Sequence, residues 1–340
     1  MISFTDEQRL LATTVREALA ATCPPDAVRA AGADPAARRG KAWQALGEVG
    51  LLGAHVPEEH GGLGLRPMDT VLAFEETGRA AVPGPIVETA VAAPPVLGVV
   101  DAAAGWPAKI AAGRAAVSVR TRDVPFLLDA DIADLLVVEC GGGAALTSPQ
   151  AAGLVRRASA DRTRRLYEEA ARAAAGAGSA AGADAEAVRA AFAYAFDHAA
   201  LAVAAQLLGA ARHLLDAAVA HAKRRQQFGR PIGSFQAVKH LLADVAVGVE
   251  FAAPVVYGAA TTLGAGAPGA SGDVSAAKVA AAAAAYRAAR AALQVHGAIG
   301  YTEELDLHLW LARVWALRTA WGDDRLHRAR LRDALLGPAG

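Results

Sequence analysis

Cysteine is scarce in this chain of 340 residues, in which Cys23 and Cys140 are the only two. With no CxxC pair and no Cys/His spacing, the sequence supports neither a disulfide framework nor a zinc site. The N-terminus also lacks the basic region and following apolar run of a cleaved secretory signal. We therefore expect a cytoplasmic protein without a metal centre.

Aromatic residues and an excess of either charge are lacking as well. Aromatics make up 5% of the sequence and alanine dominates its 54% of hydrophobic residues, a balance that favours closely packed helices over large sheets. Lys plus Arg equals Asp plus Glu at 34 each, so the overall charge gives no attraction to nucleic acid or to an anionic membrane. The apolar residues 199–220 include Arg212, His213 and Asp216, so we interpret them as a buried helix and not as a membrane span.

Local patterns along the chain run in the order helical, β, helical. Thr5 followed by acids predicts a capped helix start, and Gly and Pro break the later helical periodicity at residues 230–233 and 264–272. Apolar runs at residues 116–119 and 135–138 predict short strands. The sequence thus predicts a helical domain over residues 1–104, a small β domain over 105–184 and a helical domain over 185–340, with an Ala/Gly-rich loop at 173–183 near the second boundary.

Two blocks in the last third of the chain carry the most specific patterns. Residues 223–240 (KRRQQFGRPIGSFQAVKH) gather cations and aromatics around a helix end, where cations by themselves suit the negative end of the helix dipole. Residues 294–304 (QVHGAIGYTEE) combine glutamine, histidine and glycine. Together with residues 4–8, 43–53 and 56–64, these blocks resemble the acyl-CoA dehydrogenase family, and the similarity spans nearly the whole chain.

The resemblance implies a mainly α fold with a reduced central β domain and a C-terminal four-helix bundle. It also implies an FAD that lies between the β domain of one subunit and the C-terminal helices of a neighbour. By motif, Arg225 would pair with the FAD pyrophosphate, because an arginine fork suits a diphosphate. Phe228 and Gln236 would line the adenosine side, while Gln294 and Gly297 would approach the cofactor closely. The full set of expected FAD-binding residues is Arg225, Gln227, Phe228, Ile232, Phe235, Gln236, Gln294 and Gly297, and His296 is equally well explained by packing.

The chain departs from the family where the reaction needs a carboxylate base. In many members a Glu precedes the glycine that matches Gly322, and that position here is Trp321. In another branch the base lies ten residues before the glycine that matches Gly209, and that position here is Ala199. The neighbouring Asp323 and Asp324 are more simply interpreted as helix-capping acids, so no catalytic residue is assigned.

The β domain also lacks the family's Glu-Pro-x-Ala-Gly-Ser-Asp stretch, since only Arg122 and Asp123 separate residues 119–121 from residues 124–126. Short members of this kind resemble one subunit of heteromeric (α2β2) acyl-CoA dehydrogenases, several of which act on steroid side-chain or other bulky CoA thioesters. The leading hypothesis is therefore an FAD-binding subunit whose homologous partner supplies the Glu, with an electron-transferring flavoprotein as acceptor. A self-sufficient homo-oligomer with an atypical base and a non-catalytic helical scaffold are the alternatives.

Overall fold

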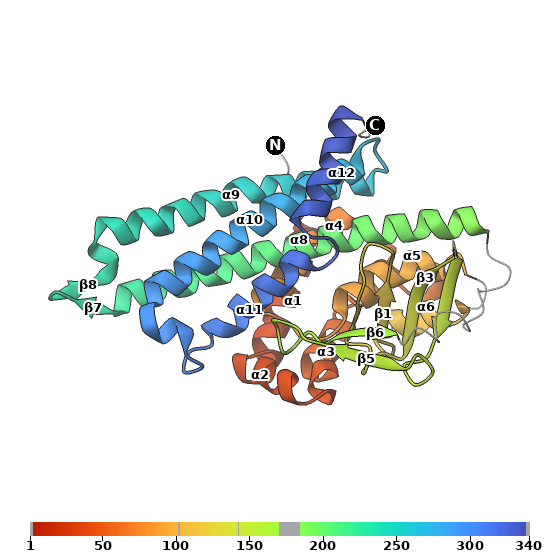
Figure 1. The fold of residues 1–340 in the computed structure, drawn as a ribbon, viewed down its shortest axis with the longest axis horizontal. Helices are drawn as coiled ribbons and strands as arrows, with labels where there is room; N and C mark the ends of the chain where they lie inside the picture. The colour runs from red at the N-terminus through yellow and green to blue at the C-terminus, as the bar shows by residue number, and fades with distance from the viewer. Residues whose placement is uncertain (1–2, 101–102, 142, 170–183, 338–340) are drawn as a thin grey trace.

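The computed structural model describes residues 3–100, 103–141, 143–169 and 184–337 (Figure 1). Helices at both ends of the chain pack against one another, and the strands form a separate small domain beside them. The expected mainly α fold with a small β domain is confirmed. The Ala/Gly-rich loop predicted at residues 173–183 lies outside the described residues.

The N-terminal region is a set of short helices. Thr5 begins the first of them as predicted, because its side chain accepts a hydrogen bond from the Gln8 amide while the Gln8 side chain accepts one from the Thr5 amide. Most of the apolar side chains of this region are buried in the core that it shares with the C-terminal helices. The helices are α1 (Asp6–Thr22), α2 (Pro25–Ala33), α3 (Lys41–Glu48), α4 (Pro67–Arg79), α5 (Ala93–Leu97) and α6 (Trp106–Ala111).

Among the residues that the structure describes, the β domain has two three-stranded sheets. In the first, β1 (Val117–Arg120) pairs in parallel with β3 (Leu135–Cys140), which pairs in antiparallel fashion with β4 (Gly143–Thr147). In the second, β6 (Leu166–Glu169) lies between β2 (Leu127–Leu128) and β5 (Leu154–Arg157), and both pairings are antiparallel. The strands predicted at residues 116–119 and 135–138 correspond to β1 and β3.

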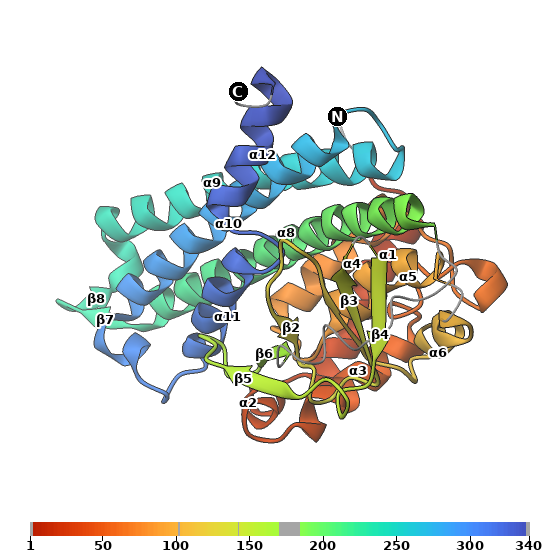
Figure 2. The same cartoon turned by 45° about the vertical axis from the view of Figure 1, so that its right-hand side comes forward.

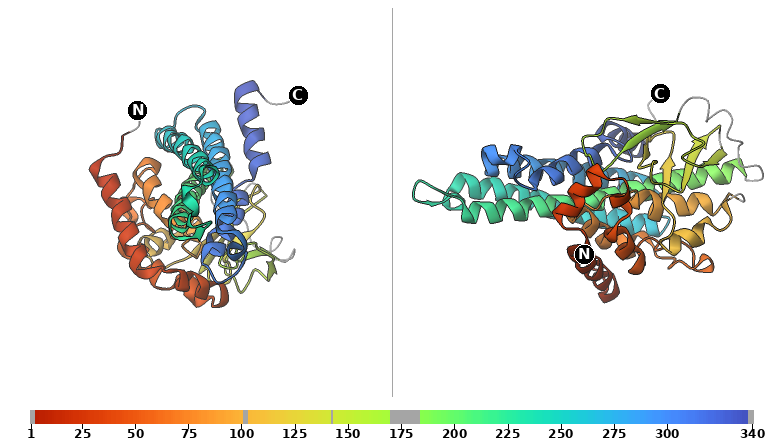
Figure 3. Two further views of the ribbon diagram at one scale, coloured as in Figure 1. Left: turned by 90° about the vertical axis from the view of Figure 1, so that its left-hand side faces the viewer. Right: turned by 90° about the horizontal axis from the view of Figure 1, so that it is seen from below.

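Three long helices dominate the C-terminal region (Figures 1 and 2). Of these, α8 (Ala185–Arg224) runs from the β domain to the opposite end of the molecule, where the short strands β7 (Gln226–Gln227) and β8 (Arg230–Pro231) form a hairpin. The chain returns along α9 (Gln236–Gly264) and runs back along α10 (Ala270–His296), and the end-on view in Figure 3 shows the three side by side. The shorter α11 (Leu307–Thr319) and α12 (Asp324–Leu336) complete the region.

Two of the described helices, α8 and α9, are long and apolar enough to span a membrane by length and composition alone. They differ in their surroundings, since 89% of the most apolar stretch of α8 is buried inside the molecule but only 28% of that of α9. The buried helix predicted at residues 199–220 is therefore confirmed as the core of α8. The apolar surface of α9 remains largely uncovered in a single chain.

The crossing of α4 and α8 depends on two glycines. A Cβ added to Gly209 would lie 1.8 Å from the carbonyl oxygen of Glu75, and one added to Gly78 would lie 2.0 Å from that of Gln206. Both distances are far below van der Waals contact. The atoms approached belong to the packed backbone of the neighbouring helix, which cannot move aside. The side chain of Gln206 donates to the Thr77 hydroxyl at 3.0 Å, so the crossing also carries a buried hydrogen bond.

We predict that Gly209→Ala lowers the free energy of unfolding by about 3 kcal/mol or more, because the methyl group forces the two backbones apart. Denaturant unfolding of the purified protein measures this loss. The matched control is Gly32→Ala in α2, where the atom nearest to an added Cβ lies at 3.4 Å. Equal stability of the two variants would show that the crossing tolerates a wider spacing.

Candidate functional site

The eight residues expected to bind FAD gather at one end of the helical region. Arg225 caps the end of α8, and Gln227 and Phe228 lie in the β7–β8 hairpin. Ile232 and Phe235 lie in the turn that follows, Gln236 begins α9, and Gln294 and Gly297 lie at the end of α10. The ring centroids of His221 and His296 are 4.2 Å apart, which joins the ends of α8 and α10. We call residues 225–236 and 294–301 the bundle tip.

The bundle tip exposes an aromatic side chain and an arginine to solvent. Phe228 is 91% exposed at a left-handed φ of 53°, and its ring stands edge-on to Phe235 at 6.1 Å. The Arg230 guanidinium lies 4.1 Å from the centre of the Phe235 ring. Arg225 is exposed and makes no side-chain ion pair with any described residue, while its main chain is fixed by hydrogen bonds with His221 and Ile232. An exposed aromatic beside unpaired cations is typical of a surface that binds a ligand or a partner.

Gly297 has a backbone conformation that other residues do not adopt. Its φ of 66° and ψ of −142° end α10, and no protein atom lies within 4 Å of a Cβ added there. The conformation alone thus requires glycine, independently of any ligand. Gln294, one turn earlier, is exposed and borders a groove of about 940 Å³ between α9 and α10, which Phe251 and Tyr286 also line.

The bundle tip and the β domain lie at opposite ends of the molecule. Figure 1 and the right-hand view in Figure 3, which is seen from below, both show the β7–β8 hairpin at one end and the strands of the β domain at the other. One copy of the chain therefore does not bring the expected cofactor residues and its own β domain into a common site.

A second region of interest lies where the β domain meets α11. A cavity of about 580 Å³, which we call the domain cavity, is lined by residues 123–126 after β1, residues 158–160 and Arg164 before β6, and residues 319–323 after α11. Trp321, at one of the two expected positions of the base, forms part of its wall.

Trp321 is fully enclosed and takes a left-handed backbone conformation with a φ of 53°. Its indole Nε1 donates to Oε1 of Glu88 at 3.0 Å. Asp323 accepts a hydrogen bond from the Leu326 amide at 2.8 Å as the N-cap of α12, which confirms the capping interpretation for this residue. Asp324 in the first turn pairs with Arg328 at 2.7 Å. Ala199, the other expected position, is buried within α8.

Two buried bases hold the turn that carries Trp321. The Lys278 ammonium donates to the carbonyl oxygens of Arg318 and Gly322 at 3.1 and 3.0 Å, and burial lowers its pKa to about 7. His327 contacts the Trp321 carbonyl through Nε2 at 2.9 Å, and burial lowers the pKa of its imidazole to about 4. The neutral imidazole thus donates to the turn from inside the core.

Glu88 is a site residue that our sequence reasoning missed. It is 3% exposed in a π-helical turn (Glu88–Ala92), and its Oε2 has no hydrogen-bond partner among the described residues. The sequence did contain a signal, since Glu88 is the only charged residue between Arg79 and Asp101. A lone acid within an apolar run predicts a buried carboxylate with a specific partner.

Comparison with solved structures defines the class of protein. The chain matches the structure of the ChsE4-ChsE5 complex from Mycobacterium tuberculosis with a TM-score of 0.80 at 23% identity, covering 99% of both chains. It matches the FAD complex of PigA with a TM-score of 0.79 at 17% identity, again covering 99% of both chains. The chain therefore has the fold of these two structures, one of which is an FAD complex.

Sequence comparison identifies the family. The models of the acyl-CoA dehydrogenase N-terminal and C-terminal domains match residues 5–103 and 189–336. The chain is 34% identical over 309 residues to acyl-CoA dehydrogenase IpdE2 of Mycobacterium tuberculosis, which covers 91% of each protein. This chain belongs to the acyl-CoA dehydrogenase family. The expected family and the expected class of oxidoreductase are thus confirmed.

The buried His327 predicts a loss of stability in mild acid. Because its pKa is about 4 when folded and near 6.5 when unfolded, the unfolded state binds more protons between these values, so its stabilising contribution is complete above pH 6.5 and is lost as the pH falls through 4. Between pH 7 and pH 4.5 we expect a loss of about 2 kcal/mol that His327→Gln does not show. Denaturant unfolding of both proteins at the two pH values measures it, and parallel losses would contradict the assignment.

Proposed function

We propose that this chain is one subunit of a heteromeric acyl-CoA dehydrogenase and contributes its bundle tip to an FAD site that a homologous partner completes. One observation carries the proposal. Most of the expected cofactor residues are exposed at the end of the molecule opposite the β domain, so a cofactor enclosed by both kinds of surface requires two subunits.

The chemistry of the bundle tip fits FAD. The Arg225 guanidinium is accessible, makes no ion pair with a described residue and offers a bidentate donor to a pyrophosphate. Phe228 presents an uncovered aromatic face for the adenosine, and Gln236 and Gln294 add exposed amides. When bound, FAD supplies the oxidant that takes a hydride from the β-carbon of the acyl thioester.

The partner would supply the proton acceptor. Trp321 and Ala199 carry no carboxylate, and a positioned general base contributes about 10² to 10⁴ in rate. The partner's Glu and its flavin-covering β segment would complete the site. The structurally similar ChsE4-ChsE5 assembly is a complex of two differently named chains, which supports this arrangement. We propose a bulky acyl-CoA thioester as substrate and an electron-transferring flavoprotein as electron acceptor.

The uncovered face of α9 supports assembly through the C-terminal helices. Phe251 is 76% exposed and Val247 54% exposed, and both line the groove that ends at Gln294. Apolar surface of this kind gains free energy when a partner covers it. An interface at this groove would bring a neighbour's β domain close to the bundle tip.

A self-sufficient homo-oligomer is the second candidate, and Glu88 is the observation that favours it. This carboxylate is bound to the tryptophan that replaces the base, and it borders the same cavity. Turnover of acyl-CoA by the protein purified alone, abolished by Glu88→Gln, would favour this candidate. A non-catalytic scaffold leaves the exposed Arg225 and Phe228 without a role.

We predict that Arg225→Ala weakens FAD binding to the assembled oligomer about 30-fold, because it removes about 2 kcal/mol of charge-assisted hydrogen bonding. Flavin absorbance per complex and titration with FAD measure the loss. Arg224→Ala is the matched control, since it removes the same charge from the adjacent exposed position and should retain FAD. Full FAD occupancy in the Arg225 variant would refute the assigned role.

A further inference from the structure

The groove between α9 and α10, which we call the α9–α10 groove, carries two arginines on its α10 side. Arg287 and Arg290 line the groove, are exposed and form no ion pair with any described residue. Asp244 on α9 is the only acid among the lining residues, and it forms no ion pair within the described part of the chain either. The groove of a single chain thus holds two cations and one anion, none of which is neutralised by contact.

The arginine side chains are placed where a partner would meet them. The Cζ of Arg287 lies 3.8 Å from a Cβ added at Gly248, so its guanidinium reaches from α10 to the backbone of α9. Arg290 donates to the Tyr286 hydroxyl at 3.4 Å. The guanidinium of Arg318 on α11 lies 4.3 Å from the centre of the same Tyr286 ring. Positive charge is therefore concentrated along this edge of the groove, where it attracts an anionic surface.

The floor of the groove is apolar. On the α9 side Phe251 is 76% exposed and Val247 is 54% exposed. On the α10 side Ala280 and Ala283 line the groove, and side chains this small let another element approach the helix closely. Such a surface gains free energy when a partner covers the apolar floor and brings carboxylates to the cationic edge.

A second copy of this chain is a poor match for the groove. Asp244, Arg287 and Arg290 lie in the half nearest the bundle tip, whereas Phe251 and Ala280 lie in the other half. If two copies met with their tips at opposite ends, the apolar half of each would cover the arginines of the other. If they met with their tips at the same end, Asp244 of each copy would pair with only one arginine of the other. Either arrangement buries an arginine without a carboxylate, which costs free energy.

We propose that the α9–α10 groove selects the partner subunit. It accepts a homologous subunit whose facing surface carries carboxylates for Arg287 and Arg290, and it disfavours a second copy of this chain. The inference rests on the proposed heteromeric assembly and adds the chemistry by which the partner is chosen. The groove reaches Gln294 of the bundle tip, so the same contact brings the partner to the cofactor residues. Opposite charges across an interface favour the right partner, and like charges disfavour the wrong one.

The affinity for the partner is the first test. The probe is a homologous acyl-CoA dehydrogenase subunit that co-purifies with this chain after co-expression, and sedimentation of the diluted complex at low and high salt gives its dissociation constant. We expect the double variant Arg287→Glu, Arg290→Glu to weaken the complex at least about 100-fold, because it sets acids against acids. We also expect high salt to weaken the wild-type complex more than the variant complex.

Two control variants separate the groove from general charge. Arg9→Glu changes an arginine of α1 that is outside the groove and whose side chain is 60% exposed, so it should leave the affinity unchanged. Asp244→Asn removes the only acid that lines the groove and should retain or increase the affinity. An unchanged affinity in the double variant, or an equal loss in the Arg9 or Asp244 variant, would overturn the proposal.

The selection against a second copy is tested on the chain alone. The double variant Arg287→Gln, Arg290→Gln leaves an apolar groove without cations, so we expect it to self-associate at least about tenfold more tightly than the wild type in sedimentation equilibrium. Both side chains are exposed, and denaturant unfolding with the wild-type midpoint shows that the variant is folded. Equal self-association of the two proteins, or none in either, would show that these arginines do not exclude a second copy.

Flavin content separates this proposal from the shared cofactor. A complex that responds to Arg287 and Arg290 as expected but holds no flavin would contradict the shared FAD site and support the role of the groove. A flavin-loaded complex whose affinity does not change on charge reversal would contradict the role of the groove and support the shared site. Failure of every homologous subunit to co-purify would contradict both.

Discussion

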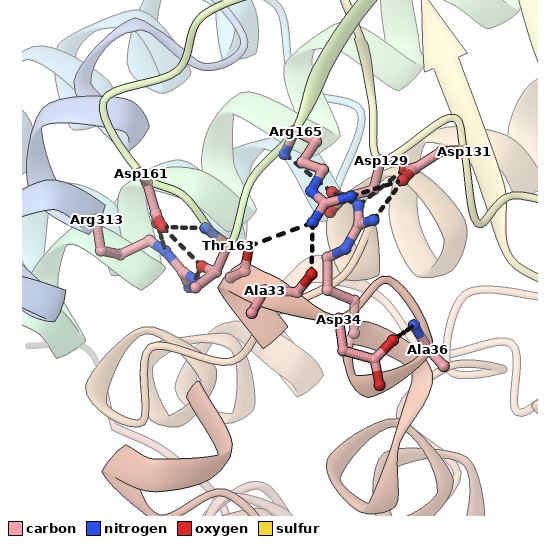
Figure 4. Close-up of polar contacts among 11 residues, drawn as sticks. Ala33, Asp34, Ala36, Asp129, Asp131, Asp161, Thr163, Arg165 and Arg313 are labelled. Atoms are coloured by element: carbon pink, nitrogen blue, oxygen red, sulfur yellow. Dashed lines mark hydrogen bonds and ion pairs between the residues drawn. The ribbon is translucent and has the colours of Figure 1, made fainter. Parts of the chain in front are cut away.

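A single buried guanidinium connects the three regions of this molecule. Arg313 on α11 donates to Asp161 and Thr163 before β6 (Figure 4) and to the carbonyl oxygen of Val82 after α4. It is 1% exposed, so loss of the Asp161 carboxylate would leave an unpaired charge in the core that costs several kcal/mol. The relative position of the β domain, the N-terminal helices and the bundle depends on this contact.

The domain cavity follows from the same contact. Its walls come from the segment that Asp161 anchors, from the turn after α11 and from Glu88 a few residues beyond Val82. With Trp321 bound to Glu88 and its turn held by Lys278 and His327, the position expected for a base is occupied by packed, hydrogen-bonded side chains. The bundle tip at the far end of α8 differs, because its surface is open and its arginines form no ion pair with any described residue. The chain thus combines a cavity beside the β domain at one end with an incomplete surface site at the other.

Features with a local physical cause were predictable from the sequence. The start of α1 at Thr5 depends on side chains three residues apart, and the breaks between α8, α9 and α10 coincide with the Gly and Pro clusters. Features set by tertiary packing were not. The strands β5 and β6 lie outside the two apolar runs from which strands were predicted, because arginines and acids interrupt their apolar alternation. Among the arginines at 162, 164 and 165, only the fold decides which one is buried.

Because the bundle tip lies far from the β domain of the same chain, we infer that two subunits share the cofactor. Visible absorbance of the flavin tests this inference most directly. The chain is purified alone, then again after co-expression with a homologous dehydrogenase subunit, and flavin is measured per chain. A ligand held by two subunits stabilises only the associated state, so the chain alone should be colourless and the complex yellow. A full complement of flavin on the chain purified as a stable monomer would contradict the shared site.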